Sequence, residues 1–215
     1  MSDLERKTAG VPTLKRLPLY LRLLRQMKET GEEYASGAVV AKELGLDPIV
    51  VRKDLAITGA VGRPRLGFQM DEIITAIEEF LGWSNTSDAF LVGVGNLGTA
   101  LLGYQGFEQH GMRIVAAFDS NPKLIGKTIH GKTILDIKKL PQLAKRMHVQ
   151  IGILTATASV AQDIADVMIE GGIRGIWNFT PAKLSVPAHV SLQREDLASS
   201  LAVLSHRLLI SNHPN

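Results

Sequence analysis

The sequence contains no cysteine. This absence excludes disulfide bonds, thiolate metal sites and cysteine nucleophiles. It also contains no run of about 18 apolar residues, which is the length that a membrane-spanning helix needs. The N-terminal segment MSDLERKTAG is charged and lacks the apolar core of a secretory signal. We therefore expect a cytoplasmic protein without a membrane partner.

A catalytic constellation is missing as well. The chain has six histidines, and none lies in a recognisable arrangement with a carboxylate or a serine. General acid–base catalysis needs a proton donor or acceptor held against the substrate. We therefore expect no catalytic residues, no metal site and no enzymatic activity.

The composition that is present is typical of a folded protein, with 45% hydrophobic and 21% charged residues. The formal net charge is only +3, and the whole surplus of Lys and Arg lies in residues 1–70. A small basic module joined to a neutral larger one suggests a head that binds a polyanion. A surplus of this size also suits an ordinary solvated surface.

The first third of the chain predicts three helices. Apolar side chains recur at helical spacing in residues 13–30, at Leu17, Leu21, Leu24 and Met27. Pro18 falls inside this pattern, so we expect it to kink the helix or to begin its regular part.

Two shorter helices follow. Ser36 is a suitable N-cap for a helix over 37–44 that ends at Gly45. Asp47 and Pro48 are a second start signal, for a helix over 48–58. Their predicted core comprises Val40, Ala41, Leu44, Leu46, Val50 and Leu55.

Two short helices joined by a tight glycine turn indicate a helix-turn-helix. The segment GAVGRPRLGF, residues 59–68, predicts a basic hairpin after it, and 71–82 predict a further helix. Together these elements describe a winged helix over residues 1–84. Its second short helix would enter the major groove, with side chains that read guanine edges or hold phosphates. The candidate DNA contacts are Lys15, Arg16, Pro48, Arg52, Lys53, Arg63 and Arg65.

A different pattern begins after the polar connector at 83–88. Apolar strands are predicted at 89–94, 114–119, 151–156, 175–179 and 189–193, with helices at 97–106, 136–147 and 159–171. Apolar strands that alternate with helices indicate a doubly wound parallel sheet, here over 85–193. The last segment, 194–215, places Leu197, Leu201, Leu204 and Leu208 in an apolar stripe with no strand left to follow it.

The stretch FLVGVGNLGTALLGYQGF, residues 90–107, holds the pattern G-x-G-x-x-G between a predicted strand and a predicted helix. Gly93 permits the tight turn, Gly95 lets the backbone approach a pyrophosphate, and Gly98 lets the helix pack on the strand. The N–H groups at the start of that helix favour phosphate. Asp119 ends the next strand, where a carboxylate can bind ribose hydroxyls and favour NAD(H) over NADP(H). It could instead cap the turn DSNP.

The sequence resembles the Rex family of redox-sensing transcriptional repressors. The resemblance covers nearly the whole chain and combines the motifs K-R-L-P-L-Y-L-R (15–22), V-R-K-D-L (51–55), G-V-G-N-L-G (93–98), Y-x-G-F (104–107), F-D-x-N-P (118–122), G-I-x-G-I-x-N-F-x-P (172–181) and D-L (196–197). It implies a cytoplasmic homodimer with a winged helix, a Rossmann domain and a domain-swapped C-terminal helix. It also implies that palindromic double-stranded operator DNA is bound by the free or NAD+-bound protein and released by NADH.

The resemblance also implies roles for single residues. Tyr104 would lie beside the nicotinamide, and Asp196 would exchange partners between redox states and pair with Arg22 on the first helix. The residues alone favour simpler roles, helix packing for Tyr104 and a helix N-cap for Asp196. The set of expected cofactor contacts is completed by Val94, Asn96, Leu97, Thr155 and Ala156.

Two positions depart from the family pattern. Thr155-Ala156-Thr157 stands where T-V-P is usual, and Arg65 stands where glycine is usual in the wing. Two further functions stay open. One is a small NAD-dependent oxidoreductase with an accessory nucleic-acid-binding head. The other is a regulator whose Rossmann domain holds another nucleotide, such as CoA or an adenylate.

Overall fold

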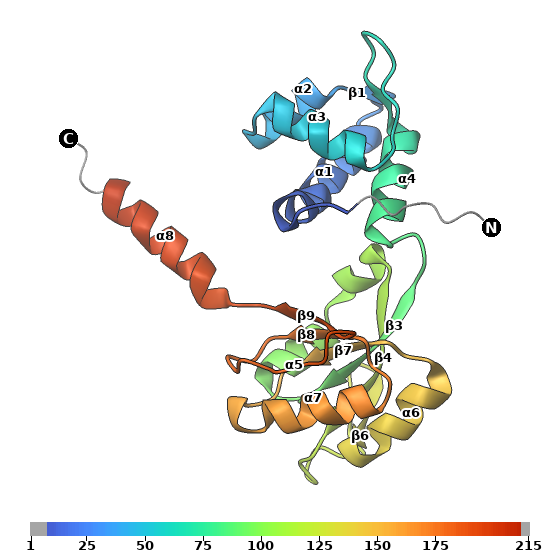
Figure 1. Cartoon of the computed structure of the whole chain (residues 1–215), viewed down its shortest axis with the longest axis vertical. Coiled ribbons are helices and arrows are strands. Elements are labelled where there is room, and N and C mark those ends of the chain that lie inside the picture. Colours follow the sequence, from blue (N-terminus) through green and yellow to red (C-terminus); the bar gives the residue numbers. More distant parts are fainter. Residues whose placement is uncertain (1–7, 212–215) are drawn as a thin grey trace. The chain divides into compact units, whose positions relative to one another are not determined.

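The computed structural model describes residues 8–211, so the outer ends of the first and last expected domains, 1–7 and 212–215, lie outside the described residues. The chain divides into two compact units between Asn85 and Thr86 (Figure 1). Unit 1 holds four helices and a two-stranded sheet: α1 (Val11–Glu29), β1 (Tyr34–Ala35), α2 (Gly37–Leu44), α3 (Pro48–Ile57), β2 (Phe68–Gln69) and α4 (Met70–Leu81).

The first helix begins before Pro18. α1 starts at Val11 with a proline in its first turn, and Pro18 lies inside it. The helix therefore does not begin at Pro18, because Pro12 already supplies the preset backbone angle of a helix start. The predicted apolar face is confirmed, since Leu17, Leu21, Leu24 and Met27 are all buried.

The helix-turn-helix forms as its capping residues predict. The Ser36 side chain accepts the backbone N–H of Val39, and the Asp47 side chain accepts those of Ile49 and Val50. Gly45 ends α2 in the left-handed conformation, at φ +64°. Val40, Ala41 and Leu55 are buried, and Leu44 and Leu46 pack on the same core as partly buried side chains.

The expected core position in α3 was wrong by one residue. Val51 is fully buried, whereas Val50 is only partly buried. One residue along a helix turns the side chain by about 100°, and the inward face of α3 is formed by Val51, Asp54 and Leu55.

The predicted hairpin is a tight turn. Arg63 and Gly67 form an isolated antiparallel bridge, and β2 pairs with β1, a strand that the sequence pattern did not indicate. Arg65, at the turn, has φ +67°. This is the left-handed region where glycine is favoured, which explains why glycine suits this position.

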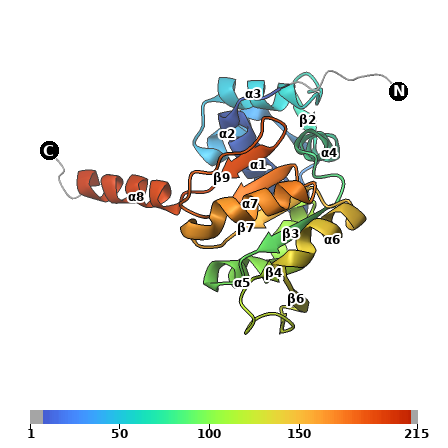
Figure 2. The same ribbon diagram turned by 60° about the horizontal axis from the view of Figure 1, so that its bottom comes forward.

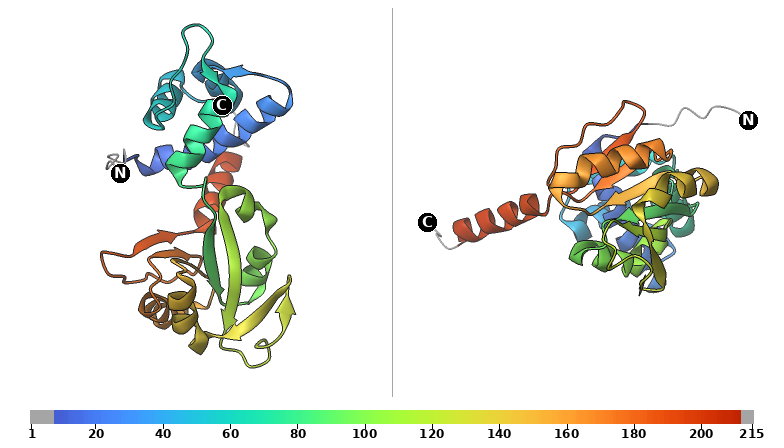
Figure 3. Two further views of the ribbon diagram at one scale, coloured as in Figure 1. Left: turned by 90° about the vertical axis from the view of Figure 1, so that its right-hand side faces the viewer. Right: turned by 90° about the horizontal axis from the view of Figure 1, so that it is seen from below.

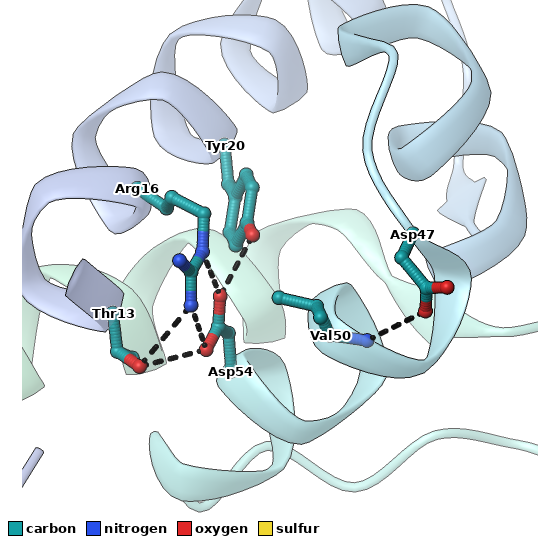
Figure 4. A network of polar contacts seen from close by, with 6 residues as sticks. All are labelled: Thr13, Arg16, Tyr20, Asp47, Val50 and Asp54. Carbon is teal, nitrogen blue, oxygen red and sulfur yellow. Dashed lines mark hydrogen bonds and ion pairs between the residues drawn. The ribbon is translucent and has the colours of Figure 1, made fainter. Parts of the chain in front are cut away.

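A buried carboxylate joins α1 to α3. Asp54 is 4% exposed and accepts hydrogen bonds from Thr13 Oγ1 at 2.8 Å, Arg16 Nε at 2.6 Å, Arg16 Nη2 at 2.9 Å and Tyr20 Oη at 2.8 Å (Figure 4). Burial alone would raise the pKa of Asp54, but the hydrogen bonds from Arg16, Tyr20 and Thr13 outweigh it and hold the pKa below its ordinary value of 3.8. The carboxylate is therefore charged at neutral pH.

Unit 2 is built on a seven-stranded sheet with the order β5-β6-β4-β3-β7-β8-β9. All neighbours are parallel except β5 and β6. Without β5, this is the strand order of the dinucleotide-binding doubly wound fold. The strands are β3 (Ser87–Val92), β4 (Met112–Asp119), β5 (Thr128–Ile129), β6 (Lys132–Asp136), β7 (Ile151–Leu154), β8 (Gly175–Asn178) and β9 (Ser191–Arg194).

Helices cover both faces of this sheet because alternate strand residues point to opposite sides. Phe90 and Val92 pack with α6 (Leu140–Met147) and α7 (Ala161–Glu170), while Ala89 and Leu91 pack on the side of α5 (Asn96–Leu102). Figure 2 shows α7 lying along the sheet. The helices of unit 2 are shorter in the structure than the sequence predicts. Parts of the predicted segments form 3-10 turns instead, at Gln105–His110 (η1), Ile137–Lys139 (η2) and Ala158–Val160 (η3).

The last helix, α8 (Leu197–Ser211), follows β9 (Figure 3). Its side chains from 198 to 211 are all exposed, and they include Leu201, Leu204 and Leu208 of the predicted stripe. Along residues 8–211 no helix is both long and apolar enough to cross a membrane.

Substitution of the buried carboxylate tests how much unit 1 depends on it. Asp54→Asn leaves the Arg16 guanidinium without its charge partner, so at pH 7 we expect the free energy of unfolding to fall by about 3 kcal/mol. A carboxylate with a lowered pKa stabilises the fold above its ordinary pKa and loses this effect as the pH falls through the folded value. The difference in the free energy of unfolding between wild type and variant, measured by chemical denaturation, should therefore become smaller below about pH 4. A difference that does not change with pH would contradict a charged, hydrogen-bonded Asp54.

Candidate functional site

The turn after β3 brings three backbone segments into close contact. Gly93 has φ +97°, and a Cβ atom there would lie 2.7 Å from the backbone nitrogen of Ala156. A Cβ atom on Gly98 would lie 2.0 Å from the carbonyl oxygen of Gly93. Both glycines are therefore needed for packing, as the G-x-G-x-x-G pattern predicts.

Gly95 differs from the other two glycines of the turn. A Cβ atom built on it meets nothing within 4 Å, and its φ is −76°. The backbone and the packing would both accept a side chain here. The space that glycine leaves open is therefore available to a ligand that approaches the turn, as a pyrophosphate does in the dinucleotide-binding fold.

Asp119 joins the end of β4 to the glycine turn. Its Oδ2 accepts the backbone N–H of Val94 at 2.7 Å, and its Oδ1 accepts that of Asn121 at 2.8 Å. The second bond is the cap of the DSNP turn that the sequence also suggested. An ionised carboxylate has about four acceptor positions, so Asp119 can cap the turn and still bind hydroxyl groups.

The loop after β7 forms the opposite wall. Thr155 Oγ1 lies 2.6 Å from the carbonyl oxygen of Gly93 and 3.1 Å from that of Val92, and it donates to them. Ala156 contacts the position that a Gly93 side chain would take. The departure from T-V-P thus retains the threonine that holds the turn and places a small alanine against it.

A pocket of about 520 Å³ lies between these walls. It is at the carboxyl ends of β3, β4 and β7, where the strand order reverses, which is the usual ligand position in open α/β sheets. Six expected residues line it, namely Gly93, Val94, Gly95, Asp119, Thr155 and Ala156. The other lining residues are not among the expected cofactor contacts; they are Val92, Ser120, Asn121, Leu124, Ile137, Thr157, Val160, Asp163, Ile164 and Val167.

Some of these additional lining residues could have been predicted from their place in the sequence. Ser120, Asn121 and Thr157 come within three residues of a strand's carboxyl end, where pocket residues are expected. Ile164 and Val167 carry no such signal, because nothing in an apolar helical pattern distinguishes a pocket wall from a core position.

Tyr104 is not among the residues that line this pocket. Its side chain is 57% exposed and borders a second hollow with Phe107 and His130. The phenol lies over Gly106, where a Cβ atom would come within 2.4 Å of its oxygen. Asn96, Leu97 and Gly98 also lie outside the pocket lining and form the first turn of α5.

An aromatic row leads away from Tyr104. Its ring meets Phe107 edge-on at 4.9 Å between centroids, Phe107 meets Trp177 at 5.6 Å, and Trp177 meets Phe179 at 4.8 Å. The indole N–H of Trp177 donates to Glu195 at 3.0 Å. This bond connects the aromatic row to the residue that directly precedes Asp196.

Asp196 acts as the N-cap of α8 in this structure. Its carboxylate accepts the backbone N–H of Ala198 at 3.0 Å and the hydroxyl of Ser199 at 3.1 Å. Arg22, its expected partner on α1, is exposed. Asp196 therefore has the helix-capping role that the residues alone suggest.

The expected DNA contacts divide into free and paired side chains. Lys15, Pro48, Arg52, Lys53 and Arg65 are exposed. Arg63 is exposed too, but it donates to the hydroxyl of Tyr34 at 3.0 Å and to Glu72 at 3.2 Å.

Arg16 is held by the buried carboxylate. It forms two hydrogen bonds with Asp54, and these raise its pKa above the ordinary value. Burial, together with the bond to Asp54, also raises the pKa of Tyr20 to about 12. Arg16 is therefore a permanent cation whose donors face mainly into unit 1.

Acidic side chains and histidines form no metal centre in the part of the chain that the structure describes, where no three of them gather in a suitable group. The polar groups of the pocket are instead backbone N–H groups, carboxylate and hydroxyl. Such groups suit a phosphorylated ribose compound.

Two family models match the chain. Residues 84–182 match the model described as "CoA binding domain", and residues 10–56 match "Putative DNA-binding protein N-terminus". The curated relatives include the redox-sensing transcriptional repressors Rex of Treponema denticola, 47% identical over 93% of this chain and 95% of the relative, and of Bacteroides fragilis, 42% identical over 92% and 90%.

Solved structures of a Rex-family repressor, RSP, are similar over both units. RSP in complex with beta-NAD+ and operator DNA has a TM-score of 0.88 at 31% identity and covers 94% of this chain and 93% of its own. RSP in complex with beta-NADH has a TM-score of 0.84 at 31% identity, with 93% and 94% covered. The relatives and the shared architecture agree with the turn, the pocket and the winged helix described above. This chain belongs to the Rex family of redox-sensing transcriptional repressors.

Proposed function

We propose that this chain is a transcriptional repressor that binds operator DNA through unit 1 and senses the NADH/NAD+ ratio through unit 2. One observation supports this most directly. A single chain combines a dinucleotide-type pocket at the sheet's switch point with a winged helix whose α3 exposes Arg52 and Lys53. The proposal includes that the protein acts in the cytoplasm and binds the nucleotide without enzymatic turnover, in line with curated relatives that are repressors by name.

The proposed cofactor contacts follow the geometry of the pocket. The pyrophosphate would lie against Gly95, and a ribose would bind the free acceptor positions of Asp119. The carboxylate would repel a 2′-phosphate, which favours NADH and NAD+ over the phosphorylated forms. Thr155 and Ala156 would form the facing wall.

The proposed partner of the chain is a second copy of itself. The exposed apolar side chains of α8, among them Leu201, Leu204 and Leu208, would pack on the other subunit. A dimer of winged helices fits a palindromic double-stranded operator, because each half-site then meets one α3. In that dimer Asp196 would exchange its capping bonds for Arg22, and Tyr104 would leave its place over Gly106 to meet the nicotinamide.

The redox signal is a difference in ligand charge. The dihydronicotinamide of NADH is neutral, whereas the nicotinamide ring of NAD+ is cationic. A ligand shifts a conformational equilibrium only by its differential affinity for the two states. The charged groups Asp196 and Arg22 supply a differential contact for this one-charge change.

One other ligand class has an observation in its favour, since residues 84–182 match a CoA-binding model. CoA carries a phosphate on its ribose, and the carboxylate of Asp119 would repel it. An oxidoreductase is disfavoured because the curated relatives are repressors by name.

The reciprocal effect of DNA and NADH tests the proposed function. NADH is expected to weaken binding to a palindromic duplex selected by the protein from a random pool, and that duplex must weaken NADH binding by the same factor, about tenfold. Fluorescence anisotropy of the labelled duplex and NADH fluorescence report the two equilibria. NAD+, NADPH and CoA serve as comparison ligands. A duplex that leaves NADH affinity unchanged, or release by CoA in place of NADH, would overturn the proposal.

Gly95→Ala tests the nucleotide pocket separately. The new methyl group meets no protein atom within 4 Å, so we expect an unchanged melting temperature. It would fill the space proposed for the pyrophosphate, and we expect NADH affinity to fall by about tenfold or more, the effect of losing about 1.4 kcal/mol. Calorimetric titration measures this. Unaltered NADH affinity in the folded variant would show that the ligand does not approach Gly95.

Arg52→Ala tests the proposed major-groove helix. The side chain is exposed and its loss leaves the core of unit 1 intact, so NADH binding and stability should not change. The affinity for the selected duplex should fall by about fivefold to a hundredfold, the range for one base contact. Glu43→Ala, an exposed change on α2, is the matched control. A variant that retains wild-type affinity would remove Arg52 from the interface.

A further inference from the structure

The buried carboxylate and the exposed cations of α3 lie next to one another in sequence. Asp54 is 4% exposed, while Arg52 and Lys53 are exposed. At about 100° per residue, Arg52 leaves the helix nearly opposite Asp54. Asp54 therefore lies on the buried face of α3, and Arg52 on its exposed face.

All bonds to this carboxylate come from one face of α1. Thr13, Arg16 and Tyr20 are spaced by three and four residues, and together they give four donors to the two oxygens of Asp54 (Figure 4). A rotation of α3 about its axis would lengthen these bonds together, so these directional bonds oppose rotation in addition to the packing of Val51 and Leu55. The cluster therefore constrains the rotation of α3 about its axis as well as its distance from α1.

Stability alone does not account for such a cluster. Replacing a buried ion pair by apolar groups of similar volume is often neutral or stabilising, since the charges no longer need to be desolvated. A second ion pair on α1 is a suitable control for the Asp54 cluster. Arg25 binds Glu78 of α4 at 2.7 Å, with side chains that are 37% and 27% exposed, and it does not involve α3.

We propose that Asp54 is a positioning residue for DNA recognition: held by Thr13, Arg16 and Tyr20, it sets the rotation of α3 and thereby the direction of Arg52 and Lys53. This inference rests on the proposed function, because it takes α3 as the helix that meets DNA. It also assigns Arg16 an indirect role in place of a direct contact with DNA. Base reading requires side chains to match the pattern of base edges, whereas phosphate attraction does not. The cluster should therefore affect specificity more than affinity for unrelated DNA.

The test replaces the polar cluster by apolar groups and leaves no donor buried without a partner. The full-length variant R16M/Y20F/D54L removes the ions and the phenol together, while Thr13 stays partly exposed to water. The control R25M/E78M removes the other ion pair of α1. For each protein, anisotropy measures affinity for the selected palindromic duplex and for an unrelated duplex of equal length, and thermal unfolding is recorded in parallel.

We expect the ratio of the two affinities to fall about tenfold or more in the cluster variant, the equivalent of one base contact, with affinity for the unrelated duplex and the melting temperature retained. The control should keep the wild-type ratio. A stable cluster variant with an unchanged ratio, or a control that loses the ratio equally, overturns the inference.

Should the triple variant fail to fold, Tyr20→Phe decides the question. It keeps the buried ring and removes one of the four donors to Asp54, and we expect the ratio to fall while unrelated DNA is bound as before. A wild-type ratio in this variant overturns the inference. If the wild-type protein itself shows no preference for any duplex, the proposed function fails rather than the role of Asp54.

Discussion

The close approach of backbone at the glycine turn is the constraint on which the nucleotide pocket depends. The carbonyl of Gly93, the first turn of α5 at Gly98 and the loop at Ala156 leave no room for a methyl group between them. Thr155 and Asp119 then hold this turn from β7 and β4. The glycine turn is thus fixed by its own backbone and by these two side chains, and its open position, at Gly95, faces the space that a ligand would fill.

Unit 1 combines an apolar core with a buried polar cluster around Asp54. In the sequence, the arginines and lysines of the winged helix form a single class of basic residues, and charge alone predicts that all of them face DNA. In the structure Arg16 points to Asp54, Arg63 contacts Tyr34 and Glu72, and Arg52 is exposed. The basic surplus therefore serves internal structure as well as the surface.

Local signals explain which features the sequence predicts well. Ser36 and Gly45 define both ends of α2, and the three glycines define the turn after β3, because capping and left-handed backbone are chemically specific. The strands β1 and β5 are two residues long and carry no such signal. The partner of Arg16 lies 38 residues away on another helix, so only the tertiary fold could reveal it. For Tyr104, the family resemblance predicts a position beside the nicotinamide, whereas the structure places its ring over Gly106.

The exposure of α8 has a consequence for how the protein responds to dilution. An isolated helix of about 15 residues is marginal in water, and α8 exposes Leu201, Leu204, Leu208 and Leu209. In the proposed dimer its order depends on the other subunit, so mass action links it to the concentration of the chain. Dilution would then melt α8 while both compact units stay folded. The amount of repressor in the cell thereby becomes a second variable, beside the redox state, that sets how much of it is competent to act.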